Sequence, residues 1–389
     1  MIFKRVIILI VDGCGIGFLP DAMEFGDRGA NTLVNAAKYC NGLALPNLES
    51  LGLGNITSIK GVKKTYSIGC YGKCAEKNKA KNTDAGHWEM MGYIKNPPFK
   101  KYPKGFPEEL ILKLEKLFGT KLIGNYQASG TEIIKKLGNE HMKTGYPIIY
   151  TSADSVLQLA AHIEVIPLKK LYAICEIARN VCVNKYEVGR IIARPFCGKN
   201  GYFFRVNDKR KDYAYRFSKE TLLDSLKKKE FATIAYGEVG ELFAMKGISK
   251  YYHTTNNKEG ITLIKKLLKT NFAGIVFGNL TDTDMLYGHR RNPFGFKDAL
   301  ESLDLEIGDI ITKLKSDDLL IVTADHGNDP TFKGTDHTRE YIPLMIYGKN
   351  TKQAVNLGIR KSFSDIGKTI AENYSVKLKE GKSFLKEIT

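Results

Sequence analysis

Three apolar segments of this chain each run directly into acidic residues. Residues 4–11 are followed by Asp12, residues 272–280 by Asp282 and Asp284, and residues 319–324 by Asp325. Runs of this length, rich in β-branched side chains, are typical of buried strands in a parallel sheet. Sheets of this kind bind ligands at the edge where their strands end. The sequence therefore predicts an α/β fold, with a mostly parallel sheet between helices that gathers acidic groups at one edge.

The connection between the last two apolar segments has the pattern of a helix. Residues 298–315 carry apolar side chains at helical spacing, as the crossover of a βαβ unit requires. The middle of the chain differs, because Pro97 and Pro98 interrupt it and short strands alternate with helices beyond them. In this middle part we expect helices at 107–118 and 169–180 and strands at 147–150, 158–161 and 190–194.

The length of the chain points to two domains. A chain of 389 residues exceeds the roughly 250–300 residues at which a single core stops growing. A smaller insertion between two halves of one α/β core accounts most simply for the change of pattern. We expect a core domain formed by residues 1–96 and 217–389, and an α+β cap domain formed by residues 97–216.

Composition limits the classes of protein to which the chain can belong. No apolar stretch reaches the roughly 18–20 residues needed to cross a bilayer, and no small-residue cleavage site follows Lys4 and Arg5, so we expect a soluble, cytoplasmic protein. Seven cysteines form no paired CxxC motifs and are expected to remain reduced. The net charge of +17 raises a nucleic-acid-binding alternative, but the basic residues are spread along the chain, which favours a solvated lysine-rich surface.

Carboxylates and imidazoles stand at or soon after the ends of the predicted strands. Mixed sets of this kind suit Mn²⁺ or Zn²⁺, and two ions about 3.5–4 Å apart can hold the attacking and leaving oxygens of a phosphoryl transfer. Taken singly, each residue could be a capping aspartate or a hydrogen-bonded core histidine, but the combination favours a pair of metal ions. The predicted ligands are Asp12, Asp284, His289, Asp325, His326 and His337.

Thr83 is the predicted nucleophile. It lies in Asn82-Thr83-Asp84-Ala85-Gly86-His87, where small residues fit the start of a helix whose amide groups and dipole favour phosphate. A threonine hydroxyl is a weak nucleophile at neutral pH and needs a metal ion to stabilise its alkoxide. Without the predicted metal ligands, Thr83 would be interpreted as a simple helix cap.

Longer motifs follow one another in order through most of the chain. They lie at residues 11–17, 20–22, 51–55, 86–92, 150–158, 188–196, 288–291, 323–329 and 334–340. Together they resemble the phosphopentomutases of the alkaline phosphatase superfamily. The resemblance implies an alkaline-phosphatase-like core with a cap inserted after the nucleophile region.

The resemblance also implies a cofactor and a set of site residues. It implies two Mn²⁺ ions, one held by Asp12, Thr83, Asp325 and His326 and the other by Asp284, His289 and His337. Thr83 would carry the phosphoryl group as phosphothreonine, with a sugar bisphosphate as the activator. The implied substrate-binding residues of the cap are Ser152, Asp154, Arg190 and Ile192, with Arg205 and Arg210 as further phosphate ligands.

Several positions depart from the family pattern. Asn82 and Ala85 replace an aspartate and a threonine around the nucleophile, Lys211 replaces a histidine, and Glu238 replaces a lysine. If Glu238 faces the cleft beneath the cap, its charge should repel substrate phosphate, and Lys211 or Lys246 should then compensate. These changes concern sugar preference more than metal binding.

The sequence thus predicts an isomerase of the intramolecular phosphotransferase kind, a phosphopentomutase. It would interconvert the 1-phosphate and 5-phosphate of ribose or deoxyribose in nucleoside salvage and catabolism. The alternative on the same core is a metal-dependent sugar phosphatase, and a nucleic-acid-binding protein is the less favoured one. We expect pentose phosphates as partners, with no nucleic acid and no membrane, and the oligomeric state stays open.

Overall fold

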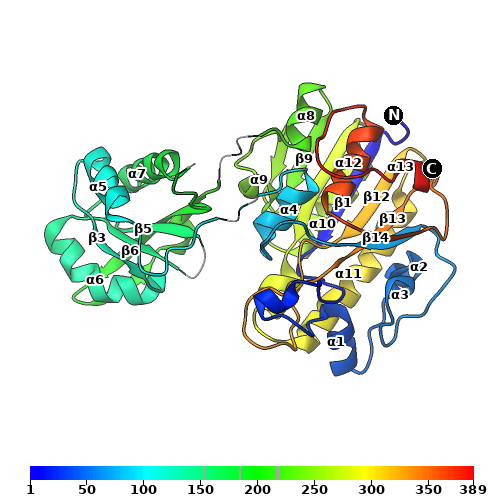
Figure 1. The fold of residues 1–389 in the computed structure, drawn as a ribbon, viewed down its shortest axis with the longest axis horizontal. Helices are drawn as coiled ribbons and strands as arrows, with labels where there is room; N and C mark the ends of the chain where they lie inside the picture. Colours follow the sequence, from blue (N-terminus) through cyan, green and yellow to red (C-terminus); the bar gives the residue numbers. More distant parts are fainter. Residues whose placement is uncertain (96, 98, 153–154, 184, 216, 218) are drawn as a thin grey trace. The chain divides into compact units, whose positions relative to one another are not determined.

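A computed structural model of the chain describes residues 1–95, 97, 99–152, 155–183, 185–215, 217 and 219–389. The chain divides into two compact units (Figure 1). Residues 1–96 and 218–389 form the first, here called the core unit, and residues 97–217 form the second, here called the inserted unit.

The core unit is built on one mixed, mostly parallel sheet. Its strands follow the order β10-β9-β11-β1-β12-β13-β2-β14. Their bounds are β1 (Arg5–Val11), β2 (Cys70–Cys74), β9 (Ala232–Tyr236), β10 (Lys250–Tyr252), β11 (Gly274–Leu280), β12 (Asp318–Thr323), β13 (Ile342–Tyr347) and β14 (Asn356–Arg360).

The three apolar segments of the sequence are neighbouring strands of this sheet. β1 lies between β11 and β12 and runs parallel to both, so Val11 pairs with Leu280 and Ile10 with Thr323. All three strands are buried along their whole length, as expected of strands covered on both faces. Their carboxyl ends therefore lie side by side, which confirms the predicted α/β fold and its acidic edge.

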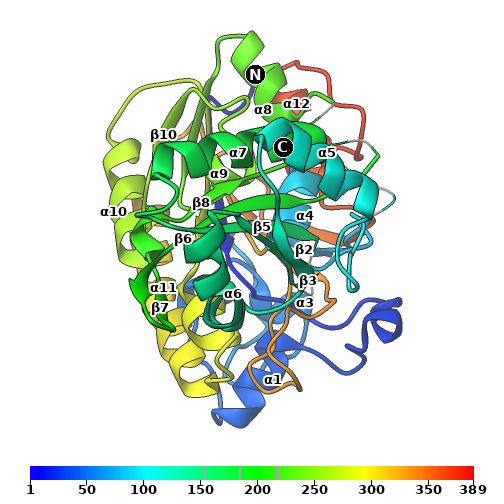
Figure 2. The ribbon, with the colours of Figure 1, turned by 90° about the vertical axis from the view of Figure 1, so that its left-hand side faces the viewer.

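Two groups of helices cover the core sheet. In the first group α11 contacts α1, α2 and α10, beside which it runs (Figure 2), and α2 contacts α3; in the second group α12 contacts α4, α8 and α13, and α4 contacts α9. The bounds are η1 (Ala22–Phe25), α1 (Thr32–Tyr39), α2 (Pro46–Ser50), α3 (Leu53–Ile56), α4 (Thr83–Met90), α8 (Leu222–Lys228), α9 (Val239–Leu242), α10 (Asn257–Leu268), the π-helical turn η3 (Thr283–Gly288), α11 (Pro293–Lys313), α12 (Ser364–Asn373) and α13 (Leu385–Ile388).

The inserted unit has its own sheet, in the order β3-β4-β5-β6-β7 with β8 paired to β6. One hydrophobic cluster packs α5 and α7 against residues such as Leu159 and Ile191, and another packs α6 against Tyr150 and Phe196. The bounds are β3 (Ile123–Gln127), β4 (Ile148–Thr151), β5 (Val156–His162), β6 (Arg190–Lys199), β7 (Tyr202–Arg205), β8 (Lys211–Tyr213), α5 (Glu108–Phe118), α6 (Gly130–Thr144), α7 (Leu168–Val181) and the 3-10 turn η2 (Asn207–Lys209).

The sequence pattern located α5 and α7 but not α6. Helix α6 begins with a capping box, in which the Ser129 side chain accepts from the Glu132 amide and the Glu132 carboxylate accepts from the Ser129 amide. This pair was readable in the sequence as a helix start.

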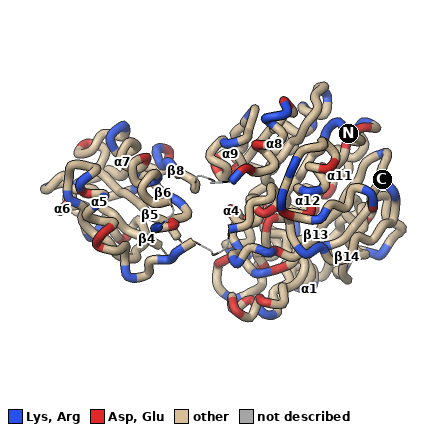
Figure 3. The backbone as a smooth tube through the Cα atoms, turned by 45° about the horizontal axis from the view of Figure 1, so that its top comes forward, with Lys and Arg blue, Asp and Glu red and all other residues tan. Residues whose placement is uncertain are grey.

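Three general features of the molecule bear on the expectations from composition. All seven cysteines are free thiols. Among the residues that the structure describes, the helices are all too short or too polar to cross a membrane. Lysine and arginine residues are distributed over many elements of both units (Figure 3).

Candidate metal centre

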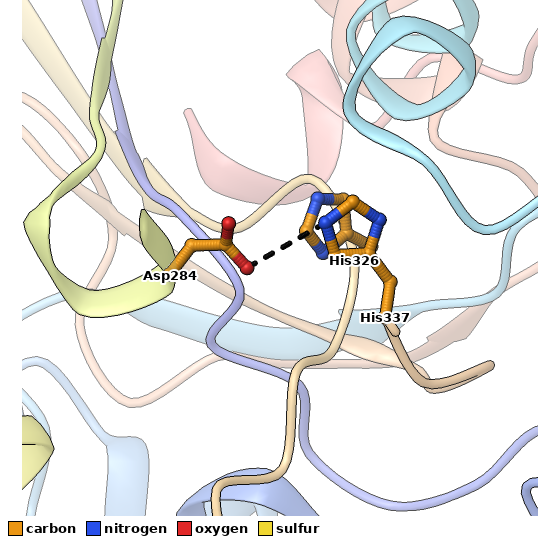
Figure 4. A group of neighbouring side chains, drawn as sticks. All are labelled: Asp284, His326 and His337. Carbon is orange, nitrogen blue, oxygen red and sulfur yellow. Dashed lines mark ion pairs between the residues drawn. The ribbon is translucent and has the colours of Figure 1, made fainter. Parts of the chain in front are cut away.

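The acidic edge of the core sheet brings together side chains that are far apart in the sequence. Asp12 follows β1, Asp284 lies in η3 just after β11, and Asp325 and His326 follow β12. His337 comes from the loop between β12 and β13. In Figure 4 the Asp284 carboxylate faces the imidazoles of His326 and His337, whose rings stack with centroids 3.8 Å apart.

Asp12, Asp325 and His326 form the first group that could hold a metal ion, with their ligand atoms within 4.8 Å of one another. His326 Nε2 lies 3.1 Å from Asp325 Oδ2 and 3.5 Å from Asp12 Oδ1. The Thr83 hydroxyl is 3.0 Å from the same nitrogen. The predicted nucleophile therefore lies against the first group of predicted ligands.

Asp284, His326 and His337 form the second group. His289 stands beside it, with Nε2 3.1 Å from Asp284 Oδ2 and 3.0 Å from His337 Nε2. His326 belongs to both groups, so the two clusters share a side and form one centre. All six predicted ligands lie in this centre.

Hydrogen bonds to backbone and amide groups orient the cluster. The Thr335 carbonyl oxygen lies 2.7 Å from His289 Nδ1, so that nitrogen carries a proton, and the ring is held with Nε2 toward Asp284. Asn279 Nδ2 donates to Asp12 Oδ2 at 2.6 Å, and Asn328 Nδ2 donates to Asp284 Oδ1 at 2.7 Å. The two amides fix one oxygen of each carboxylate; the other oxygen of Asp12 has no hydrogen-bond partner in the described part of the chain, and the other oxygen of Asp284 faces His289.

The electrostatics of the cluster are those of a site with an excess of buried negative charge. Burial raises the pKa of Asp12 well above its ordinary value, and the carboxylates of Asp325 and Asp284 act in the same direction. Burial opposes the charging of His326, but the adjacent Asp325 carboxylate outweighs it and raises the pKa of His326 to about 9. For Asp284, hydrogen bonds with His289 and His337 outweigh burial and lower the pKa.

These features fit a divalent cation. Among the described residues, Asp12 Oδ1 and Asp325 Oδ2 are buried oxygens without a hydrogen-bond partner. Unpartnered buried carboxylate oxygens are costly in a folded protein unless a cation neutralises them. The donor set of carboxylate oxygens and imidazole nitrogens is the one that suits Mn²⁺ or Zn²⁺.

Thr83 is the first residue of α4, as the sequence predicted, and Asn82 occupies the cap position. His87, one turn later, donates from Nδ1 to the Thr83 carbonyl oxygen at 2.9 Å, and the same nitrogen is 3.5 Å from Asp325 Oδ2. Gly86 permits this close approach, because a Cβ there would lie 2.1 Å from the Asp325 carbonyl oxygen. Helix α4 therefore packs directly against the loop that follows β12.

The predicted substrate-binding residues belong to the inserted unit. Ser152 follows β4 and is half-buried, and Asp154 lies outside the described residues. Arg190 and Ile192 begin β6, and Arg205 ends β7.

Two arginines of the inserted unit contact one carboxylate, that of Asp212. Arg210 Nε and Nη2 donate to Asp212 at 2.7 and 2.5 Å, and Arg190 Nη1 lies 3.4 Å from the same carboxylate. On the neighbouring part of the sheet, Arg194 Nε donates to Gln158 Oε1 at 2.9 Å. These contacts involve three arginines and a single aspartate.

The departures from the family pattern occupy different places. Glu238 is exposed between β9 and α9. Burial and the carboxylates of Asp325 and Asp284 raise the pKa of Asp12 most, and the negative charge of Glu238 adds a smaller effect in the same direction. Lys211 lies over the rings of Tyr172 and Tyr213, on the inserted unit. Lys246 Nζ lies 3.7 Å from Asp224 Oδ2 in the core unit.

Residue pattern alone did not find several groups that contact the site. Asn279, Asn328 and His87 each contact a predicted ligand or the nucleophile segment. Asn328 and His87 lie inside motifs that carried the resemblance, and Asn279 is a polar residue within a buried strand. That last feature was the available signal, since a buried amide needs a partner.

Comparison with known proteins adds to this geometry. The family model of the metalloenzyme superfamily matches residues 4–378. The phosphopentomutase of Dictyoglomus turgidum (strain DSM 6724 / Z-1310) is 51% identical over 387 residues, covering 99% of this chain and 98% of that protein. The phosphopentomutase of Clostridium novyi (strain NT) is 49% identical over 387 residues, covering 99% of each.

One solved structure shares the fold over the full length. The PH0037 protein from Pyrococcus horikoshii aligns with a TM-score of 0.50 at 16% identity, covering 98% of this chain and 100% of that one. With about half of its residues identical to those of curated relatives over nearly the whole length of both chains, the chain belongs to the phosphopentomutase family of the metalloenzyme superfamily.

Proposed function

We propose that this chain is a phosphopentomutase that interconverts the 1-phosphate and 5-phosphate of ribose or deoxyribose through a phosphothreonine at Thr83. The observation that carries the proposal is the position of the Thr83 hydroxyl, 3.0 Å from His326 Nε2 at the start of α4. A hydroxyl placed against metal-ligating side chains and a helix amino terminus is suited to carry a phosphoryl group.

Family membership makes the chain a metalloenzyme, and we propose that it uses two Mn²⁺ ions. Asp12, Thr83, Asp325 and His326 would hold one ion. Asp284, His289 and His337 would hold the other. When bound, such ions supply positive charge to the Thr83 oxygen and to the phosphate oxygens in the transition state.

The proposed cycle balances without water. Phosphothreonine 83 gives its phosphoryl group to the free hydroxyl of the sugar monophosphate, and a sugar bisphosphate and free Thr83 result. The Thr83 oxygen then attacks the other phosphate, which restores phosphothreonine and releases the isomeric monophosphate. The proton lost by the sugar hydroxyl in the first step is returned to the second sugar oxygen in the last. A trace of sugar bisphosphate primes the cycle by phosphorylating Thr83.

The inserted unit acts as the cap in this proposal. Its arginine cluster supplies guanidinium groups that match phosphate oxygens, and Asp212 keeps two of them in place. Ser152, Asp154 and Ile192 would contact the sugar, and Arg205 would contribute to phosphate binding. By holding the bisphosphate and excluding water, such a cap separates a mutase from a phosphatase.

The proposed partners are small molecules. Pentose phosphates are charged and do not cross membranes unaided, so we place the enzyme in the cytoplasm, where it would serve nucleoside salvage and catabolism. The wide distribution of lysine and arginine over both units supports a solvated surface rather than a nucleic-acid groove (Figure 3).

One assay tests the function. The metal-loaded protein is incubated with ribose 1-phosphate and a trace of sugar bisphosphate, and ribose 5-phosphate and free phosphate are measured together. We expect ribose 5-phosphate with little free phosphate, and the modified peptide should contain Thr83. Free phosphate as the main product would identify a phosphatase, and phosphate on Ser152 would refute the assigned nucleophile. Exhaustive chelation should abolish the activity and Mn²⁺ should restore it.

A further inference from the structure

Arg339 is a buried arginine that lies two residues beyond His337 in the segment leading into β13. Its side chain is only 1% exposed, and its guanidinium lies over the Phe25 ring. An arginine has five N–H donors in a rigid fork, and here each has an acceptor. The acceptors are Asp21 Oδ1 and Oδ2 (3.1 Å each), Glu76 Oε2 (2.6 Å), the Glu76 carbonyl oxygen (3.1 Å) and the Ala80 carbonyl oxygen (2.6 Å).

Three of these acceptors, on Glu76 and Ala80, belong to the segment that leads to the proposed nucleophile. Residues 75–82, between β2 and α4, contain no helix or strand, and all of them are described. Side chains must therefore hold this backbone in place. Arg339 donates hydrogen bonds to the carbonyl oxygens of Glu76 and Ala80. The Glu89 carboxylate accepts hydrogen bonds from the amides of Lys77 and Asn78.

Ion pairs tie the same two segments together in the opposite direction. Lys81, two residues before Thr83, lies 2.9 Å from Asp27 Oδ2 and 3.4 Å from Asp336 Oδ2. Asp27 Oδ2 also accepts from the Arg339 backbone amide at 2.9 Å. The segment before Thr83 and the segment around His337 are thus cross-linked by a cation from each side.

We propose that Arg339 is a positioning residue for phosphoryl transfer, which holds residues 76–80 against the His337 segment and so sets the position of the Thr83 hydroxyl relative to the metal ligands. The proposal rests on the proposed function of Thr83. A lysine keeps the charge but offers only three donors from one point, so it cannot bind two carboxylates and two carbonyl groups together. Misplacement of a reacting group by about 1 Å can cost about 100-fold in rate.

The core unit offers a matched control. Arg360 is also a buried arginine, bound to Asp365 at 2.9 Å, to Glu387 at 3.2 Å and to the Lys382 carbonyl oxygen at 3.1 Å, with its guanidinium over Phe384. The partners of its side chain all lie in the carboxyl-terminal part of the chain, and its backbone carbonyl oxygen accepts from the Ala75 amide at 2.8 Å, a contact that a lysine keeps. Arg360→Lys therefore removes a buried guanidinium of the same kind but leaves every side-chain contact of residues 76–82 in place.

The experiment compares Arg339→Lys, Arg360→Lys and the parent as full chains. Three quantities are measured: the Kd for Mn²⁺ by calorimetry, the single-turnover rate of Thr83 phosphorylation by a sugar bisphosphate, and amide hydrogen exchange of residues 76–82 without metal. For Arg339→Lys we expect an unchanged Kd, a phosphorylation rate lower by about 100-fold and faster exchange in this segment. Arg360→Lys should match the parent in all three, even where its Tm falls.

Two results would overturn the proposal. Phosphorylation and exchange equal to those of Arg360→Lys would show that Arg339 only stabilises the fold, and a loss of Mn²⁺ affinity as large as the loss of rate would place its effect on the ligands. If the parent itself does not phosphorylate Thr83, the proposed function fails, and the exchange comparison alone decides the role of Arg339. Should Arg339→Lys not fold, Glu76→Gln, which removes one ion pair of the same guanidinium, is measured in its place, with the same pattern expected at smaller size.

Discussion

Glu89 allows a stability prediction whose size follows from its contacts. The residue lies on α4, and its side chain is fully buried. The carboxylate accepts hydrogen bonds from three backbone amides and one hydroxyl. These donors are Lys77 N (2.9 and 3.0 Å), Asn78 N (2.7 Å), Phe363 N (2.9 Å) and Ser362 Oγ (2.8 Å).

The perturbation is Glu89→Gln, which preserves the shape of the side chain. The new NH₂ group donates, so in either orientation it faces at least one backbone N–H that then has no acceptor. A buried donor without a partner costs about 1–3 kcal/mol, and the loss of charge assistance in the remaining bonds adds about 1 kcal/mol. Burial raises the pKa of Glu89 although its hydrogen bonds lower it, so a neutral side chain recovers part of the desolvation penalty. We therefore expect the free energy of unfolding to fall by about 2 kcal/mol.

The assay uses Trp88, the single tryptophan of the chain, which neighbours Glu89 and is buried. Its fluorescence during urea unfolding at neutral pH reports on the core unit around α4. Glu259→Gln is the control, because that exposed carboxylate also accepts a backbone amide, from Thr255 at 2.8 Å, but water can replace it. The control should stay within about 0.5 kcal/mol of the parent. An equally small change for Glu89→Gln would refute the reasoning that its buried hydrogen bonds stabilise the fold.

Three further predictions concern the site and the inserted unit. His326→Ala should remove a ligand shared by both groups and lower the rate by several orders of magnitude, so activity near that of the parent would refute the ligand assignment. Glu238→Lys should lower the Michaelis constant for ribose 5-phosphate and Lys211→Ala should raise it, with metal affinity unchanged; constants that stay the same would make both positions solvated surface. Burial lowers the pKa of His141, whose Nε2 accepts from the His162 amide. Below pH 6.5 this histidine therefore binds a proton more readily in the unfolded chain than in the folded one. The stability that the neutral His141 contributes is complete above that pH and is lost as the pH falls toward its lower folded pKa. Hydrogen exchange of α6 should therefore show weaker protection at about pH 5.5 than at neutral pH. Equal protection at the two pH values would contradict this prediction.

Local pattern was sufficient for the elements that position the site. Apolar strands that end in acidic residues located β1, β11 and β12, because burial on both faces leaves a nearly continuous apolar run in the sequence. The small residues after Thr83 located the start of α4 for the same local reason, since only the helix terminus is involved. The mixed carboxylates and imidazoles at these ends identified a metal site as a chemical class.

Only the tertiary structure decided which of these groups share a ligand and what holds the nucleophile. His326 reaches both groups because β12 lies next to β1 in the sheet, an adjacency that the order of segments in the chain does not contain. The segment of residues 75–82 has no periodicity from which its path could be predicted, and its position depends on Arg339 and Glu89, which meet it only after the chain has folded. Helix and strand patterns are local and survive in the sequence, whereas partners in a buried polar network are chosen by three-dimensional proximity alone.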